Sequence, residues 1–235
     1  MPRVDEAIIL AGGFGTRLQS VVKDVPKPLA PVAGRPFIEY LLDLLAKQGI
    51  RKVVLATGYL AEVVERTLGD SWKGMSLAYS VENVPLGTGG ALAQAIKHLV
   101  GDAFFVLNGD TFLYLNYEDF DRSAEREGSP ICMALADVAD VGRYGAVETV
   151  GSQVVGFSEK GAQGRGRINA GVYRIARSLT NEFPRVDSFS FEQAVLVPQA
   201  AQRSVTAYTD TSDFIDIGVP EDFERAQSLF SQVPR

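Results

Sequence analysis

Leu10-Ala11-Gly12-Gly13-Phe14-Gly15-Thr16-Arg17-Leu18 tells most about the architecture of this chain, because it follows an apolar run that predicts a buried strand over residues 7–11. The three glycines let the backbone come close to a ligand and turn its N–H groups toward anionic oxygens. Arg17 adds a planar fork of donors that suits phosphate, and Lys27, within Pro26-Lys27-Pro28, adds a compact charge. Two cations and a nest of amides after a first strand predict a triphosphate site.

The two most familiar phosphate loops do not fit this stretch. No Gly-Lys-Ser or Gly-Lys-Thr follows the glycines, which excludes the P-loop. The dinucleotide fingerprint, read from Gly13 and Gly15, requires a third glycine at position 18, where Leu18 stands. The stretch is therefore a phosphate loop of another type.

The first half of the chain alternates strand and helix patterns. This alternation predicts right-handed crossovers and an α/β fold, a Rossmann-like, doubly wound, mostly parallel or mixed sheet. Ligands on such sheets bind at the carboxyl ends of the strands. The predicted strands are 7–11, 52–57, 75–81 and 104–108, and the predicted helices are 37–45 (with Gly49 as its cap), 60–68 and 91–100.

The second half has a different character, because short apolar runs follow one another with few helical gaps. It predicts a mixed extension of the sheet, closed by a last strand and a helix that starts at Pro220. We see no linker or repeat, so we expect one domain over residues 1–235, with halves that meet near residue 115. The predicted elements are strands at 131–138, 145–150, 153–158, 168–175 and 204–208 and a helix at 221–230.

Composition narrows the class of protein. The chain has 235 residues, 46% of them hydrophobic, and a formal net charge of −6, which argues against a nucleic-acid binder. The single cysteine, Cys132, cannot form an internal disulfide and lies in an apolar run that predicts burial. The single histidine, His98, is expected to be structural or exposed. We see no signal peptide or membrane-spanning run and expect a cytoplasmic protein with no membrane partner.

These motifs together resemble the signature of the sugar-1-phosphate nucleotidyltransferases, which join a sugar phosphate to a nucleotide and release pyrophosphate. Within that family the chain looks most like the D-glycero-D-manno-heptose 1-phosphate guanylyltransferases, which make GDP-heptose for bacterial capsule or other surface polysaccharide. The resemblance covers nearly the whole chain and is strongest at 12–18, 20–22, 24–28, 34–37, 85–91, 143–145 and 168–173.

Two aspartates are candidate metal ligands. Asp110 closes Asn108-Gly109-Asp110 after a buried-strand run, and Asp216 follows apolar residues and precedes Gly218. A carboxylate at such a strand end, beside a phosphate loop, is well placed for Mg²⁺. The resemblance implies that Asp110 and Asp216 hold the catalytic Mg²⁺ between them. Asp210 and Asp213 are nearby competitors, and an aspartate at a strand end can instead cap a turn.

Base identity rests on Glu82, in a segment that resembles the family's base-reading loop. Guanine presents N1–H and the 2-amino group side by side, and a carboxylate complements both donors, whereas an amide suits thymine or uracil. Glu82 therefore favours GTP; the alternative is a surface charge at a strand end, with the Gly87 backbone reading the base. The nucleotide-binding set is Leu10, Ala11, Gly12, Gly13, Gly15, Thr16, Glu82, Gly87, Thr88 and Asn108.

The resemblance also implies a sugar-phosphate set. It places Lys160 on the sugar phosphate and Asn169 on sugar hydroxyls. Glu192 falls where relatives carry a sugar-contacting carboxylate, and it also suits the first turn of a helix. The whole set is Gly145, Glu159, Lys160, Asn169, Gly171 and Glu192.

The expected partners are GTP and a sugar 1-phosphate, and a homodimer is left open. A phosphate monoester is mostly dianionic at pH 7, so the attack on the α-phosphorus needs no general base. Catalysis then consists of positioning and charge neutralisation by Arg17, Lys27, Asp110 and Lys160. The alternatives are a mannose or N-acetylmuramate phosphate nucleotidyltransferase, use of dTTP or UTP, and a non-catalytic nucleotide-sugar sensor.

Overall fold

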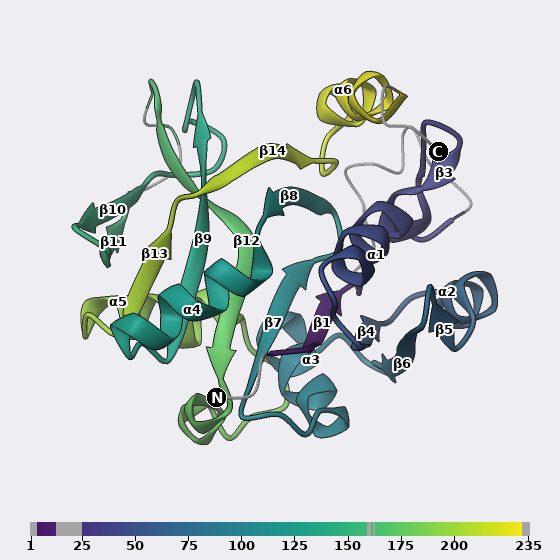
Figure 1. Cartoon of the computed structure of the whole chain (residues 1–235), viewed down its shortest axis with the longest axis horizontal. Coiled ribbons are helices and arrows are strands. Elements are labelled where there is room, and N and C mark those ends of the chain that lie inside the picture. The colour runs from purple at the N-terminus through teal and green to yellow at the C-terminus, as the bar shows by residue number, and fades with distance from the viewer. Residues whose placement is uncertain (1–3, 13–24, 159–160, 162, 232–235) are drawn as a thin grey trace.

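The computed structural model describes residues 4–12, 25–158, 161 and 163–231, and its elements surround a ten-stranded sheet (Figure 1). Strand β1 (Glu6–Leu10) runs parallel to β4 (Lys52–Thr57) on one side and to β7 (Ala103–Asn108) on the other. Strand β6 (Met75–Val81) is parallel to β4, and β5 (Ser71–Trp72) closes that edge. These four parallel strands match the predicted runs to within one residue at each end.

Helices cover both faces of the sheet, as a doubly wound fold requires. Successive side chains of a strand point to opposite faces, so Ile9 belongs to one hydrophobic cluster and Ile8 to another. The cluster with Ile9 includes α1 (Phe37–Lys47), α2 (Ala61–Leu68) and α4 (Tyr117–Glu127), and the cluster with Ile8 includes α3 (Gly87–Ala95). Figure 1 shows α1 and α4 in front of the sheet and α3 behind it.

The second half of the chain continues the same sheet. Strand β12 (Gly166–Ala176) pairs antiparallel with both β7 and β9 (Ile131–Val138), so it joins the two halves. Strand β13 (Val205–Tyr208) is parallel to β9, and β11 (Gln153–Phe157) and β10 (Val147–Val150) follow antiparallel at the edge. The predicted mixed extension is confirmed.

The predicted helices are confirmed, with one change of bounds. Gly49 has φ +83° after α1, and α6 (Pro220–Ser231) begins at the proline. Helix α3 begins at Gly87 instead of residue 91, because Gly87-Thr88-Gly89-Gly90 forms its first turn. It passes into a 3-10 turn, η2 (Ile96–His98), instead of reaching residue 100. His98 is exposed there.

Strands β8 (Thr111–Leu115) and β14 (Thr211–Asp216) and helix α4 were not predicted, and neither were β5 and several short elements. Strands β8 and β14 form a separate antiparallel pair, and α4 follows β8. The side chain of Asn116 caps α4 by accepting the N–H groups of Glu118 and Asp119. The remaining short elements are η1 (Lys27–Leu29), β2 (Pro31–Val32), β3 (Arg35–Pro36), η3 (Arg177–Glu182), η4 (Glu192–Leu196) and α5 (Val197–Ala201).

Cys132 is fully buried in β9, as predicted. Burial raises the pKa of its thiol to about 11, so the thiol stays protonated at neutral pH. No helix in the described part of the chain is long and apolar enough to span a bilayer.

Candidate active site

Two adjoining cavities open where β1, β4, β6 and β7 end. Both are lined by Leu10 and Thr88, so they meet at the carboxyl end of β1. The first, which we call the base cavity, has a volume of about 460 Å³, and the second, which we call the acidic cavity, about 270 Å³. Further residues of the base cavity are Gly12, Gly58, Tyr59, Glu82, Asn83, Val84, Pro85, Gly87 and Ala91.

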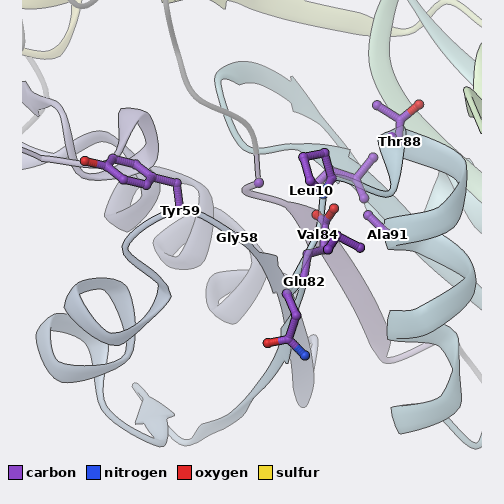
Figure 2. A pocket seen from close by; sticks show the side chains of 11 residues that line it. Leu10, Gly58, Tyr59, Glu82, Val84, Thr88 and Ala91 are labelled. Atoms are coloured by element: carbon purple, nitrogen blue, oxygen red, sulfur yellow. The ribbon is translucent and has the colours of Figure 1, made fainter. Parts of the chain in front are cut away.

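Glu82 organises the base cavity (Figure 2). Its backbone N–H donates to the carbonyl of Thr57 at 2.8 Å, directly after the end of β6. One carboxylate oxygen, Oε2, accepts the N–H of Leu86 at 2.9 Å and closes the loop between them. The other oxygen, Oε1, lies beside the Cα of Gly12. The side chain that was predicted to read the base is therefore held in the cavity wall by its own loop.

The glycines at the start of α3 serve packing as well as ligand access. Gly87 lines the base cavity with φ +68°, and a Cβ on it would lie 2.6 Å from the carbonyl oxygen of Phe189. A Cβ on Gly90 would lie 2.2 Å from the carbonyl oxygen of Asp187. The hydroxyl of Thr88 accepts the N–H of Phe191 at 3.0 Å. The base cavity is thus tied to the segment that precedes Glu192.

Backbone pairing brings the two predicted metal carboxylates together. Asp110 follows β7, Asp216 ends β14, and Asp216 pairs with Thr111 across the two-stranded sheet. The N–H of Ile217 also donates to the carbonyl of Asp110 at 2.9 Å. Both aspartates line the acidic cavity with Asn108, Thr111, Tyr144, Asn169, Ala170, Gly171, Tyr173, Phe191, Glu192 and Phe214.

Each of these carboxylates has a cationic neighbour. The Nζ of Lys27 lies 2.5 Å from Oδ2 of Asp110, and a guanidinium nitrogen of Arg143 lies 3.3 Å from Oδ2 of Asp216. Oδ1 of Asp216 accepts the N–H of Gly218 at 2.7 Å. Burial nevertheless raises the pKa of the Asp216 carboxyl, and the negative charge of Asp110 raises it further. The two like charges are close enough to repel each other.

This donor set fits Mg²⁺. Within the described residues, no group of three or more His, Cys, Asp and Glu side chains is placed to hold a metal ion. Two carboxylates suffice for Mg²⁺ when substrate phosphates and waters supply the other oxygens. Of the competitors considered, Asp210 and Asp213 do not line the acidic cavity. Asp213 lines a different cavity, between α1 and α6.

A bulge in β12 shapes the sugar side of the acidic cavity. The pairing with β9 shifts register between Asn169 and Tyr173, and Gly171 in between has φ +70°. Oδ1 of Asn169 accepts the N–H of Gly171 at 3.0 Å, and its Nδ2 donates to the hydroxyl of Tyr173 at 2.7 Å. A Cβ on Gly171 would lie 2.4 Å from Nδ2 of Asn108. Because Gly171 has no side chain, the side chain of Asn108 can lie directly against its backbone.

Glu192 lines the acidic cavity as the first residue of a π-helix, η4. The Val197 N–H closes that helix on the carbonyl of Glu192, and Pro198, which follows, has no N–H to donate. Such π-turns are frequent at functional sites. Gly145 differs from expectation: it lies in a buried turn with φ +83°, and its neighbour Tyr144, not Gly145, lines the cavity. Tyr173 and Phe214 also line the cavity, although neither was predicted as a site residue.

Comparison with known proteins identifies the family. Residues 6–232 match the family model described as nucleotidyl transferase. The chain belongs to that family.

Its similar relatives are sugar-phosphate guanylyltransferases. The D-glycero-alpha-D-manno-heptose 1-phosphate guanylyltransferase of Aneurinibacillus thermoaerophilus is 40% identical over 223 residues, which cover 94% of this chain and 96% of the relative. The protein of the same name from Campylobacter jejuni is 42% identical over 222 residues, 93% of this chain and 96% of the relative. HddC from Yersinia pseudotuberculosis, whose structure was also solved with GMP-PN, superposes with a TM-score of 0.86 at 37% identity over 97% of this chain and 100% of HddC. The predicted family, fold class and resemblance are confirmed.

Part of the predicted site of this nucleotidyltransferase lies outside the described residues. In the phosphate loop these are Gly13, Gly15, Thr16 and Arg17, and in the sugar-phosphate set they are Glu159 and Lys160. Ala11, which is described, donates its N–H to the carbonyl of Ala56 at 2.8 Å and so extends the β1–β4 ladder.

Proposed function

We propose that this protein transfers GMP from GTP to D-glycero-α-D-manno-heptose 1-phosphate and releases pyrophosphate, in nucleotide-sugar synthesis for a surface polysaccharide. The observation that carries the proposal is the junction of the two cavities at Leu10 and Thr88. A nucleoside in the base cavity and a sugar phosphate in the acidic cavity would meet at that junction, where the new bond forms. The similarity to heptose 1-phosphate guanylyltransferases supports the choice of substrates.

Guanine fits the base cavity because of Glu82. Its Oε2 accepts one N–H, from Leu86, and each carboxylate oxygen has two lone pairs. The carboxylate therefore keeps acceptors for N1–H and the 2-amino group of guanine. Uracil and thymine would place a carbonyl oxygen against it instead, which sets an acceptor against a half-buried carboxylate.

The reaction itself is a displacement at the α-phosphorus. The sugar phosphate is already an anion, so the protein has to position it and offset charge. Asp110 and Asp216 would hold Mg²⁺, which supplies charge neutralisation at the phosphate oxygens. Lys27, which is paired with Asp110, would lie beside the same oxygens, and Arg17 would hold the leaving pyrophosphate.

The sugar phosphate would occupy the acidic cavity. We assign its phosphate to Lys160 and its hydroxyls to Asn169 and Glu192, two of the residues that line the cavity. The nucleotide then belongs to residues 1–115 and the sugar phosphate to 116–235. The protein acts in the cytoplasm, where the reduced, buried Cys132 is stable. A non-catalytic sensor has no need to keep Lys27 and two carboxylates together.

The sugar assignment is tested by product analysis. Purified protein is incubated with GTP, Mg²⁺ and either heptose 1-phosphate or mannose 1-phosphate, and the GDP-sugar is quantified by mass spectrometry. We expect a higher kcat/KM with the heptose. A preference for mannose 1-phosphate would show that the heptose assignment is wrong and leave guanylyl transfer intact. A failure to form any GDP-sugar would refute the proposed reaction.

A further inference from the structure

Arg143 lies between the acidic cavity and helix α6. It belongs to the loop between β9 and β10, and it forms ion pairs with two carboxylates at once. One guanidinium nitrogen, Nη2, lies 3.3 Å from Oδ2 of Asp216, and the other, Nη1, pairs with Oδ2 of Asp222 in the first turn of α6. Its guanidinium carbon lies 4.3 Å from the ring centroid of Tyr144, which lines the acidic cavity.

The contact with Asp216 engages an oxygen that a metal ion could use. Oδ1 of Asp216 accepts the N–H of Gly218 and Oδ2 faces Arg143, so each oxygen keeps one lone pair, and a metal on Oδ2 would lie beside the guanidinium. A cation at Asp216 and the guanidinium of Arg143 cannot share Oδ2 without strong repulsion.

The other contacts of Arg143, with Asp222 and with the ring and hydroxyl of Tyr144, do not involve the metal carboxylates. Its pair with Asp222 and its stacking on Tyr144 can persist when the Asp216 contact breaks. The side chain of Asp222 is only 10% exposed, so this anchor is well shielded from solvent. Release of Asp216 therefore does not require the Arg143 side chain to leave Asp222.

We propose that Arg143 is a positioning residue that competes with the divalent cation for Asp216: it neutralises this carboxylate beside Asp110 and gives it up when the metal binds. The inference rests on the metal site of the proposed function. It predicts that removal of Arg143 tightens metal binding and lowers the thermal stability of the metal-free protein.

The chain offers a matched control. Arg225 pairs with the other oxygen of the same partner, Oδ1 of Asp222, at 3.2 Å, and it makes no ion pair with Asp216. Arg225→Gln removes one positive charge from the same helix end. Arg143→Gln removes the same charge together with the contact to Asp216. The difference between the two variants isolates that contact.

The test measures Mn²⁺ binding to the whole protein by electron paramagnetic resonance, with a non-hydrolysable GTP analogue at one fixed concentration for all variants and without sugar phosphate. We expect Arg143→Gln to bind Mn²⁺ about threefold tighter than wild type, the scale of a partly exposed ion pair, and Arg225→Gln to bind as wild type does. In thermal melts with chelator, Arg143→Gln should unfold at a lower temperature and gain more from added Mn²⁺. Circular dichroism checks that each variant is folded.

Asp216→Asn distinguishes a wrong metal assignment from a wrong role for Arg143. If it binds Mn²⁺ as wild type does, the metal assignment of the proposed function is wrong. If it loses affinity but Arg143→Gln gains none, Arg143 does not compete for Asp216 and the inference is overturned. An equal gain in Arg225→Gln would also overturn it, because the effect would then be general charge.

Discussion

The carboxylate of Glu82 fills the space beside Gly12. A Cβ added to Gly12 would lie 2.6 Å from Oε1 of Glu82, closer than real atoms approach. Gly12 is not in the left-handed region of φ, so its backbone would accept alanine. A side chain at Gly12 would therefore take the space that the Glu82 carboxylate occupies.

Gly12→Ala should accordingly impair nucleotide use without harming the fold. The methyl group displaces Glu82, and a misplaced binding group of this kind lowers kcat/KM for GTP about tenfold or more. Gly58→Ala is the matched variant, because a Cβ there meets Glu82 only at 3.9 Å, an ordinary contact. Steady-state kinetics on both variants checks the prediction. Equal losses in the two would show that the position of Glu82 is not what Gly12 protects.

Gly90→Ala should destabilise the protein, although alanine has a higher helix propensity than glycine. Alanine in a helix interior normally stabilises by about 0.5–1 kcal/mol relative to glycine. Here a Cβ would lie 2.2 Å from the backbone carbonyl of Asp187, which cannot move aside as a side chain could. We expect a loss of about 1–3 kcal/mol in the free energy of unfolding, measured by urea denaturation. A more stable variant would contradict the close packing of α3 on this segment.

Asp110→Asn should remove most of the activity and leave the protein folded. The variant keeps the shape of the side chain but takes a negative charge from the proposed metal site. Loss of metal-assisted charge stabilisation lowers kcat by about a hundredfold or more. Asp213→Asn, a nearby carboxylate outside the acidic cavity, should stay close to wild type. Near-normal turnover by Asp110→Asn at limiting Mg²⁺ would rule out the metal assignment.

The raised pKa of Asp216 predicts a pH-dependent stability difference. Burial first, and then repulsion by Asp110, holds the pKa of this carboxyl above its ordinary value of 3.8. An acid with a raised pKa in the folded state destabilises the fold above that pKa, and the penalty disappears below the unfolded value. With chelator present, Asp216→Asn should therefore melt above wild type at pH 7, and the difference should shrink as the pH falls toward 4. The melting-temperature difference between Asp216→Asn and wild type should be larger at pH 7 than at pH 5. A smaller difference at pH 7 would contradict the prediction.

The sequence predicted the parts of the fold that depend on local pattern. The apolar runs of β1, β4, β6 and β7 are long and bounded by turn residues, so each strand was found. Helix α4 was missed because its apolar residues are few among charged ones, although the capping Asn116 and the closing Gly128 are signals that could have found it. Strand β14 was missed because its residues are largely polar or exposed.

Some features of the candidate site were likewise predictable from the sequence, and others were not. Asp110 was predicted from its place after a buried strand, and Asn169 from the family resemblance, and both line the acidic cavity. The contacts of Arg143 and the packing of Gly90 join segments about 70 to 100 residues apart in the chain. No periodicity or spacing encodes such contacts, because they depend on how β14 and the segment before Glu192 fold back on the sheet.

The central claim is that the base cavity reads guanine through Glu82, and one comparison of kcat/KM for pyrophosphate release tests it most directly. Wild type and Glu82→Gln are assayed with GTP, dTTP and UTP; glutamine can keep the bond to the Leu86 N–H, so the loop is preserved. We predict that wild type prefers GTP by a factor of about a hundred or more, and that the variant uses GTP less well and narrows this gap. A wild type that prefers dTTP or UTP, or an unchanged ratio in Glu82→Gln, would contradict the account.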